Sequence, residues 1–119
     1  MADAVEFFDA TRLAAFRSHA HAVVAHARRG LLALPGTGPL CTPEESGFVS
    51  MAAVELPPAA RPQVAGHPRM DPLQHWLRRV HGIEVLVGSW GGRRYLRISA
   101  HLYSSLDDAE RLLAAIRAA

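Results

Sequence analysis

The stretch "IEVLVGSWGGRRYLRIS", residues 83–99, carries the pattern that decides the fold. Two apolar runs flank the pair Gly91-Gly92, an arrangement typical of a β-hairpin. Along the second run, side chains alternate between the two faces of the strand. We expect Leu96 and Ile98 to lie under helices. The opposite face, which would meet water in an isolated domain, is then expected to carry Tyr95, Arg97 and Ser99.

Three helices are expected around this hairpin. The first runs from about Val5 to Leu34, because apolar residues recur at three- and four-residue spacing before Pro35-Gly36 ends the helix. The second begins at Asp71-Pro72, an N-cap followed by a proline at the first helical position. The third begins at Ser105, which forms a capping-box pattern with Asp108. The inward residues are expected to be Leu13, Phe16, Ala20, Val23, Val24, Ala27 and Leu31, then Leu73, Trp76, Leu77 and Val80, then Leu106, Leu112, Leu113 and Ile116.

One further strand is expected within "FVSMAAVELP", residues 48–57, ahead of a proline-rich loop. The predicted order is therefore α-β-α-β-β-α. This order predicts an α+β fold with a small, mostly antiparallel sheet of about three strands, a long N-terminal helix, and helices on one face of the sheet. A length of 119 residues indicates a single domain spanning 1–119.

Composition excludes several classes of function. All thirteen basic residues are arginine, eleven residues are acidic, and the formal net charge is +2. No basic run exceeds two residues, so we expect no nucleic-acid interface. We expect no signal peptide and no membrane span, because the acidic N-terminus lacks an apolar core and no long apolar run follows. The single cysteine, Cys41, precludes an internal disulfide and favours the reducing cytoplasm.

The histidines do not predict a metal site. His19, His21 and His26 share the first helix, with His19 and His26 near one face and His21 pointing elsewhere. Zinc requires three or four ligands at close range, often at i, i+4, and this spacing is poor. A small metalloenzyme is therefore the weakest of the alternatives.

Arg97 is the candidate binding residue. A guanidinium is always charged and holds a carboxylate with two parallel hydrogen bonds. At the end of a strand, beside the polar loop that contains His101 and Tyr103, it is well placed to hold a substrate acid. The alternative is a surface arginine paired with a neighbouring glutamate.

Two segments resemble a known family: "SMAAVELP" at 50–57, and the run from Asp71 to Ile116 that contains "RISAHLYSS" at 97–105. They are similar to the C-terminal small domain of class V aminotransferase-family enzymes, pyridoxal-phosphate proteins of fold type I, and most similar to the isopenicillin-N-epimerase-like branch. The resemblance implies that Arg97 binds the α-carboxylate of an amino-acid substrate. Tyr103 and His101 are further candidates in the same loop, and Ser104 stands where the family commonly has asparagine.

The cofactor implied by this family is pyridoxal phosphate, held by a lysine in a large domain that lies N-terminal to this segment. No lysine occurs in this chain. We therefore expect no catalytic residue and no cofactor site on this chain, inactivity of the isolated chain, and a need for a large domain in trans or for a homo-oligomer. Epimerase, lyase and aminotransferase chemistry stay open, as do separate encoding, loss or removal of the large domain. The alternative function is a non-catalytic binding or self-association module that uses the sheet face around Arg97.

Overall fold

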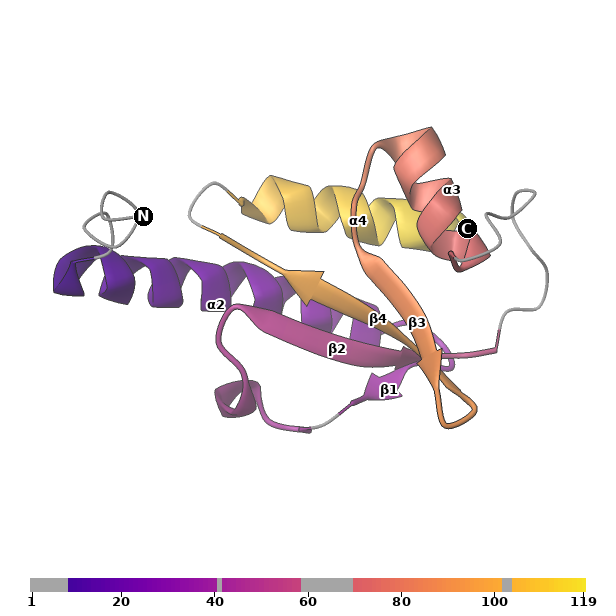
Figure 1. Ribbon diagram of the computed structural model, residues 1–119, viewed down its shortest axis with the longest axis horizontal. Coiled ribbons are helices and arrows are strands. Elements are labelled where there is room, and N and C mark those ends of the chain that lie inside the picture. Colours follow the sequence, from indigo (N-terminus) through magenta and orange to yellow (C-terminus); the bar gives the residue numbers. More distant parts are fainter. Residues whose placement is uncertain (1–8, 41, 59–69, 102–103) are drawn as a thin grey trace.

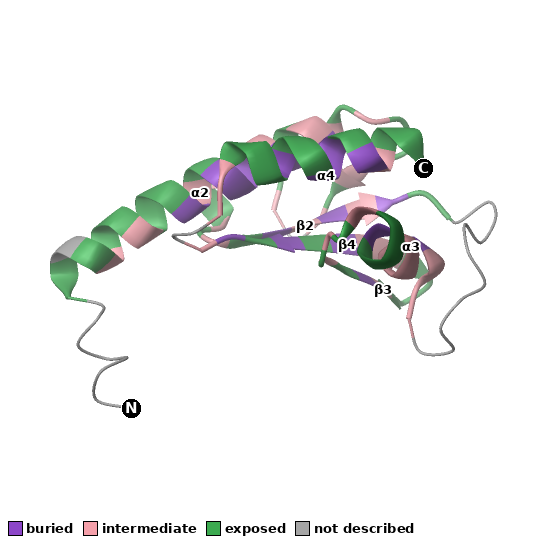
Figure 2. Ribbon diagram, turned by 90° about the horizontal axis from the view of Figure 1, so that it is seen from above, coloured by how far each residue is buried: buried purple, intermediate pink, exposed green. Residues whose placement is uncertain are grey.

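The computed structural model describes residues 9–40, 42–58, 70–101 and 104–119. Figure 1 shows a twisted sheet with the long first helix and the last helix lying side by side behind it. Seen from above in Figure 2, these two helices form one layer and the strands form the other. In chain order the elements are α2 (Ala10–Leu32), β1 (Gly38–Pro39), the 3-10 turn η1 (Glu45–Gly47), β2 (Met51–Leu56), α3 (Pro72–His81), β3 (Leu86–Trp90), β4 (Arg93–Ser99) and α4 (Leu106–Ala118).

The sheet has four strands in the order β1-β2-β4-β3, and every neighbouring pair is antiparallel. The predicted hairpin is β3 and β4, joined by Gly91 and Gly92 with φ angles of 58° and 78°. Positive φ at both central residues defines the turn type that matches strand twist, and glycine adopts it at least cost. The α+β prediction is thus confirmed, with four strands in place of about three. The additional strand is β1, whose Pro39 is tolerated at the sheet edge because an edge strand has a side without ladder partners.

The helix ends follow local capping chemistry. Asp71 and Ser105 cap α3 and α4 as predicted, and Ser105 forms the full capping box with Asp108. α2 begins at Ala10, because the Asp9 side chain accepts a hydrogen bond of 2.9 Å from the backbone N–H of Arg12. The predicted start near Val5 lies outside the described residues, and the helix ends two residues before the predicted Leu34.

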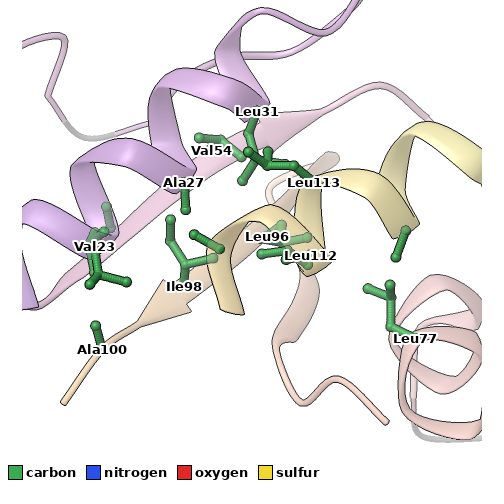
Figure 3. Close-up of a cluster of buried hydrophobic side chains, with 14 of the residues drawn as sticks. Val23, Ala27, Leu31, Val54, Leu77, Leu96, Ile98, Ala100, Leu112 and Leu113 are labelled. Carbon is green, nitrogen blue, oxygen red and sulfur yellow. The ribbon is translucent and has the colours of Figure 1, made fainter. Parts of the chain in front are cut away.

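The core lies between the sheet and the α2–α4 layer (Figure 3). Val54 of β2, beside Leu31 of α2, and Leu96 of β4, beside Leu112 of α4, are fully buried. Gly30 allows α2 to approach α4 closely, because a Cβ atom there would collide with the side chain of Leu113. Most predicted inward residues are buried or partly buried. Val80 and Leu106 were wrongly predicted: they are 59% and 51% exposed, and each lies near the end of its helix.

α3 lies beside the edge strand β3 (Figure 1). The Gln74 side chain accepts a hydrogen bond of 2.8 Å from the backbone N–H of Val87, a donor at the outer edge of the sheet. Leu73 and Leu77 of α3 join the common core. An open edge would otherwise present unpaired backbone groups, so α3 protects this side of the sheet. Across the described ranges, no helix is long and apolar enough to cross a bilayer.

Candidate functional site

The three arginines of β4 have different partners. Arg93 donates to Glu55 of β2 with an Nε–Oε1 distance of 2.9 Å. Arg94 donates to both carboxylate oxygens of Asp71 at 2.9 and 2.6 Å. Arg97 makes no hydrogen bond or ion pair within the described part of the chain.

The strand register explains this difference. Arg97 lies opposite Ala53 on β2 and Leu86 on β3, neither of which carries a charge. The side chains of Arg97, Ala53 and Leu86 lie on the sheet face away from α2 and α4, because side chains alternate along each strand. We call this face the open face. The open face as a whole comprises Met51, Ala53, Glu55, Leu86, Gly88, Trp90, Arg93, Tyr95, Arg97 and Ser99. As the alternation predicted, Leu96 and Ile98 are buried on the helix side and Arg97 and Ser99 are exposed.

Arg97 lines two hollows, one on either side. On the β3 side, a hollow of about 260 Å³ is lined by Gln74, Arg78, Ile83, Glu84, Val85, Leu86, Arg97 and Ser99. In this hollow the charge of Arg78 is already neutralised by Glu84, with which Arg78 forms an ion pair at an N–O distance of 3.4 Å. Tyr95 covers another part of the open face. Its ring lies so close to Gly88 that a Cβ atom on that glycine would collide with the phenol.

The hollow on the β2 side measures about 250 Å³ and differs in character. The described residues that line it include two arginines and no acid: Arg28, Leu40, Thr42, Gly47, Phe48, Met51, Ala52, Ala53 and Arg97. One wall is the segment that joins β1 to β2, which leaves the sheet and returns through η1 (Figure 1). We call the space between this segment and β2 the β2-side hollow.

Three side chains of α2 hold that wall in place. His21 Nδ1 lies 3.1 Å from the carbonyl oxygen of Phe48. Arg28 donates to the carbonyl oxygen of Thr42 at 2.6 Å, and Arg29 donates to Glu45 at 2.6 Å. Because these contacts span both ends of the segment, α2 fixes its position relative to the sheet.

Arg28 was not singled out from the sequence. Its side chain is only 3% exposed, and its guanidinium lies 5.3 Å from the centre of the Phe48 ring. A signal was available, because Arg28 follows Val24 by four residues and precedes Leu31 by three, which places it on the apolar stripe of the helix. The identity of the loop it reaches could not be read from that spacing.

The other candidates are not gathered around Arg97. Tyr103 lies outside the described residues. The His101 ring packs on Phe16 of α2 with ring centroids 5.0 Å apart, on the helix side of the sheet, whereas Arg97 is on the open face. Ser104 accepts a hydrogen bond of 2.9 Å from the backbone N–H of His101 and thereby shapes the loop.

The helix histidines make separate contacts. His19 Nε2 lies 2.5 Å from the carbonyl oxygen of Ser104, and His26 Nε2 lies 2.5 Å from Glu110 of α4. His21 reaches Phe48 on another side, as the helical spacing predicted. In the part of the chain that the structure describes, no three histidine, cysteine or acidic side chains gather as metal ligands. The chain has no lysine, the residue with which pyridoxal phosphate forms a Schiff base.

The two carboxylates that pair with β4 arginines have lowered pKa values. Hydrogen bonding from Arg93, aided by its charge, lowers the pKa of Glu55 against a smaller opposing effect of burial. For Asp71, burial raises the pKa, but hydrogen bonds from Arg94 and the Leu73 N–H, together with the charge of Arg94, outweigh it and lower the pKa overall. Both groups are therefore held as anions, and Arg97 is the β4 guanidinium that has no acidic partner among the described residues.

A scan against models of protein families finds no match for this sequence, and a search of curated proteins finds none either.

Proposed function

We propose that this chain is a carboxylate-binding domain of the kind found at the C-terminus of isopenicillin-N-epimerase-like, class V aminotransferase-family enzymes. In this proposal Arg97 binds the α-carboxylate of an amino-acid substrate, while pyridoxal phosphate and its lysine belong to another domain. The observation that carries the proposal is the state of Arg97. It is the β4 arginine without an acidic partner among the described residues, and it lines two hollows on the open face.

The neighbours of Arg97 suit this role. Ala53 and Leu86 flank it without competing for its N–H donors, so both edges of the guanidinium fork are available to a carboxylate. A charge-assisted hydrogen bond strengthens when water is excluded. Covering the open face with another domain would therefore strengthen the interaction between Arg97 and its ligand.

The open face also has apolar residues that favour such a cover. Met51, Leu86 and Trp90 are 48%, 36% and 83% exposed, and all three belong to this face. Apolar side chains grouped around a polar anchor are typical of interaction surfaces. The chain supplies binding and orientation in this proposal, and the chemistry belongs to the domain that carries the cofactor. The single cysteine is in keeping with a place in the reducing cytoplasm.

The test is affinity capture of the tagged chain from an extract of its source cells. We expect a protein with the visible absorption of bound pyridoxal phosphate to co-purify, and the complex to turn over an amino acid. Arg97→Met should abolish that turnover. The matched control is Arg79→Met, because Arg79 is exposed on α3 and lines neither hollow. A chain that elutes alone and colourless, or full turnover with Arg97→Met, would overturn the proposal.

A second candidate is a self-association module that uses the same open face. The exposure of Met51, Leu86 and Trp90 on one face favours it. Sedimentation equilibrium should then show a concentration-dependent dimer that Leu86→Ser weakens. Val80→Ser is the control, because Val80 is 59% exposed on α3 and does not belong to the open face. A monomer at all concentrations would exclude this candidate.

A further inference from the structure

We propose that the β2-side hollow binds a small dicarboxylate, with Arg97 holding one carboxylate and Arg28 holding the other. The inference rests on the proposed function only for the role of Arg97. It adds a second binding residue and a substrate class: amino acids or related acids with a second anionic group on a short apolar chain.

Arg28 is a buried cation whose charge the described residues do not neutralise. Arg28 is 3% exposed, yet among the described residues its hydrogen bond goes to the neutral carbonyl oxygen of Thr42. The Phe48 ring, 5.3 Å away, supplies a cation–π contact. A guanidinium has five N–H donors, and a buried charge is costly unless it is paired. The donors that remain belong to a side chain that lines the hollow, where a carboxylate would satisfy them.

The lining of the hollow selects the ligand. Among the described residues that line it there is no aspartate or glutamate, so Arg28 and Arg97 give it a strong preference for anions. Apart from the two arginines the described lining is mostly apolar, contributed by Leu40, Phe48, Met51, Ala52 and Ala53. A volume of about 250 Å³ is below that of pockets for drug-sized ligands, which indicates a ligand of few atoms. Two carboxylates joined by a few methylenes match both features.

The fold creates this space by ending β1 early. β1 pairs only with Val54 and Glu55, so the outer edge of β2 from Met51 to Ala53 is left without it. The chain then swings outward through η1 and is held by α2 (Figure 1). Close contact between Gly47 and Thr42, where a Cβ on Gly47 would collide with the threonine, keeps the wall compact. The hollow is thus bounded by a fixed wall, with Arg28 and Arg97 reaching it from different elements.

The competing explanation is that Arg28 serves only to tie the loop to α2. The two explanations predict different relative affinities for dicarboxylates and monocarboxylates. If Arg28 is only a tie, a dicarboxylate and a monocarboxylate of equal length should bind equally well through Arg97. If Arg28 binds the second carboxylate, the dicarboxylate should bind about tenfold more tightly, as expected for one added charge-assisted contact.

The experiment compares adipate with hexanoate, and glutarate with pentanoate, by calorimetry and by amide chemical shifts of the full chain at constant ionic strength. We expect about tenfold tighter binding of each dicarboxylate. Arg28→Met should remove this advantage and leave monocarboxylate binding intact, whereas Arg97→Met should weaken both classes. Arg79→Met is the control that should change neither. Circular dichroism checks that each variant folds, and the comparison on the unaltered chain does not depend on any variant.

Equal binding of the two classes, both lost in Arg97→Met, would overturn this inference while leaving Arg97 as a carboxylate-binding residue. Failure of both classes to bind would also overturn it, and the proposed function would still be decided separately by affinity capture. A dicarboxylate advantage that survives Arg28→Met in a folded protein would exclude Arg28 as the second binding residue.

Discussion

At the scale of single residues, the register of β4 assigns different roles to chemically identical side chains. Glu55 lies opposite Tyr95, two residues along β4 from Arg93 on the open face, and Asp71 at the start of α3 reaches Arg94 on the helix side. Ala53 and Leu86 stand where a partner for Arg97 would be. Within the described part of the chain, Arg93 and Arg94 are thus each neutralised by a carboxylate, whereas Arg97 is not.

Placing an acid opposite Arg97 should occupy it. In Ala53→Glu the new carboxylate lies directly across the strands on the same face, a position from which opposite charges contribute about 0.2–1 kcal/mol. We expect unchanged folding, a small gain in stability, and a loss of carboxylate binding of about tenfold or more. Ala53→Gln, which has the same size without the charge, should bind nearly as well as the original chain. The affinity of each variant is measured by titration with hexanoate. Undiminished binding in Ala53→Glu would show that Arg97 is not the binding residue.

The Asp71–Arg94 pair should be the most important ion pair for stability. Its side chains are 13% and 15% exposed, and Asp71 also caps α3 by accepting from the Leu73 N–H at 2.9 Å. Asp71→Ala removes both the cap and the ion pair and leaves the largely buried guanidinium of Arg94 without its partner. We therefore expect the free energy of unfolding, measured in urea, to fall by about 3 kcal/mol. Asp71→Asn keeps the cap and should lose less. Equal losses in the two variants would show that the cap contributes nothing beyond the ion pair, and no loss in Asp71→Asn would show that the ion pair contributes nothing.

The same pair makes stability depend on pH on the acid side. Because the folded state lowers the pKa of Asp71 below its ordinary value of 3.8, the folded state binds its proton more weakly than the unfolded state does. The stabilisation is complete above the unfolded pKa and is lost as pH falls through the folded one. Unfolding free energies measured from neutral pH down to the acid limit should therefore fall less steeply in Asp71→Asn. An identical slope in both proteins would contradict the lowered pKa.

At the scale of elements, the packing of α2 on α4 depends on Gly30. A glycine inside a helix lowers its intrinsic stability, so its presence here is explained by the space that Leu113 occupies. The capping signals could be read from the sequence because an N-cap and its partner are separated by only two or three residues. The Gly30–Leu113 contact could not, because it joins residues far apart in the chain and depends on how the two helices cross.

Gly30→Ala should therefore destabilise the protein although alanine is the better helix former. Overpacking typically costs 1–3 kcal/mol, against a gain of about 1 kcal/mol in helix propensity, so we expect a net loss of about 1 kcal/mol in urea unfolding. Gly38→Ala is the matched control, because nothing lies within 4 Å of a Cβ there. Adding Leu113→Ala to Gly30→Ala should cost less than the two single changes summed. Strict additivity would show that the two residues do not compete for space.

At the scale of the whole molecule, alternation along "RRYLRIS" was enough to predict two unlike sheet faces and to place Arg97 on the open one. The β2-side hollow was beyond such reasoning. It requires a two-residue strand formed by Gly38 and Pro39, which have low strand propensity, and a helix arginine that meets a loop fourteen residues later. Local patterns predict which face a side chain takes, whereas a site built from α2, a loop and β4 is decided by tertiary packing.

The open face leads to a prediction about the two tryptophans. Trp90 is 83% exposed at the end of β3, whereas Trp76 lies against His81 with ring centroids 4.5 Å apart and is partly buried. In the free chain, acrylamide should quench the fluorescence of the Trp76→Phe variant, which reports on Trp90, more strongly than that of Trp90→Phe. When a partner domain or a second copy covers the open face, quenching of Trp90 should fall sharply and quenching of Trp76 should change little. Trp90 and Arg97 share one face. Protection of Trp90 without any change in carboxylate affinity would therefore show that the bound partner does not reach Arg97. Protection of neither tryptophan would show that the partner binds elsewhere.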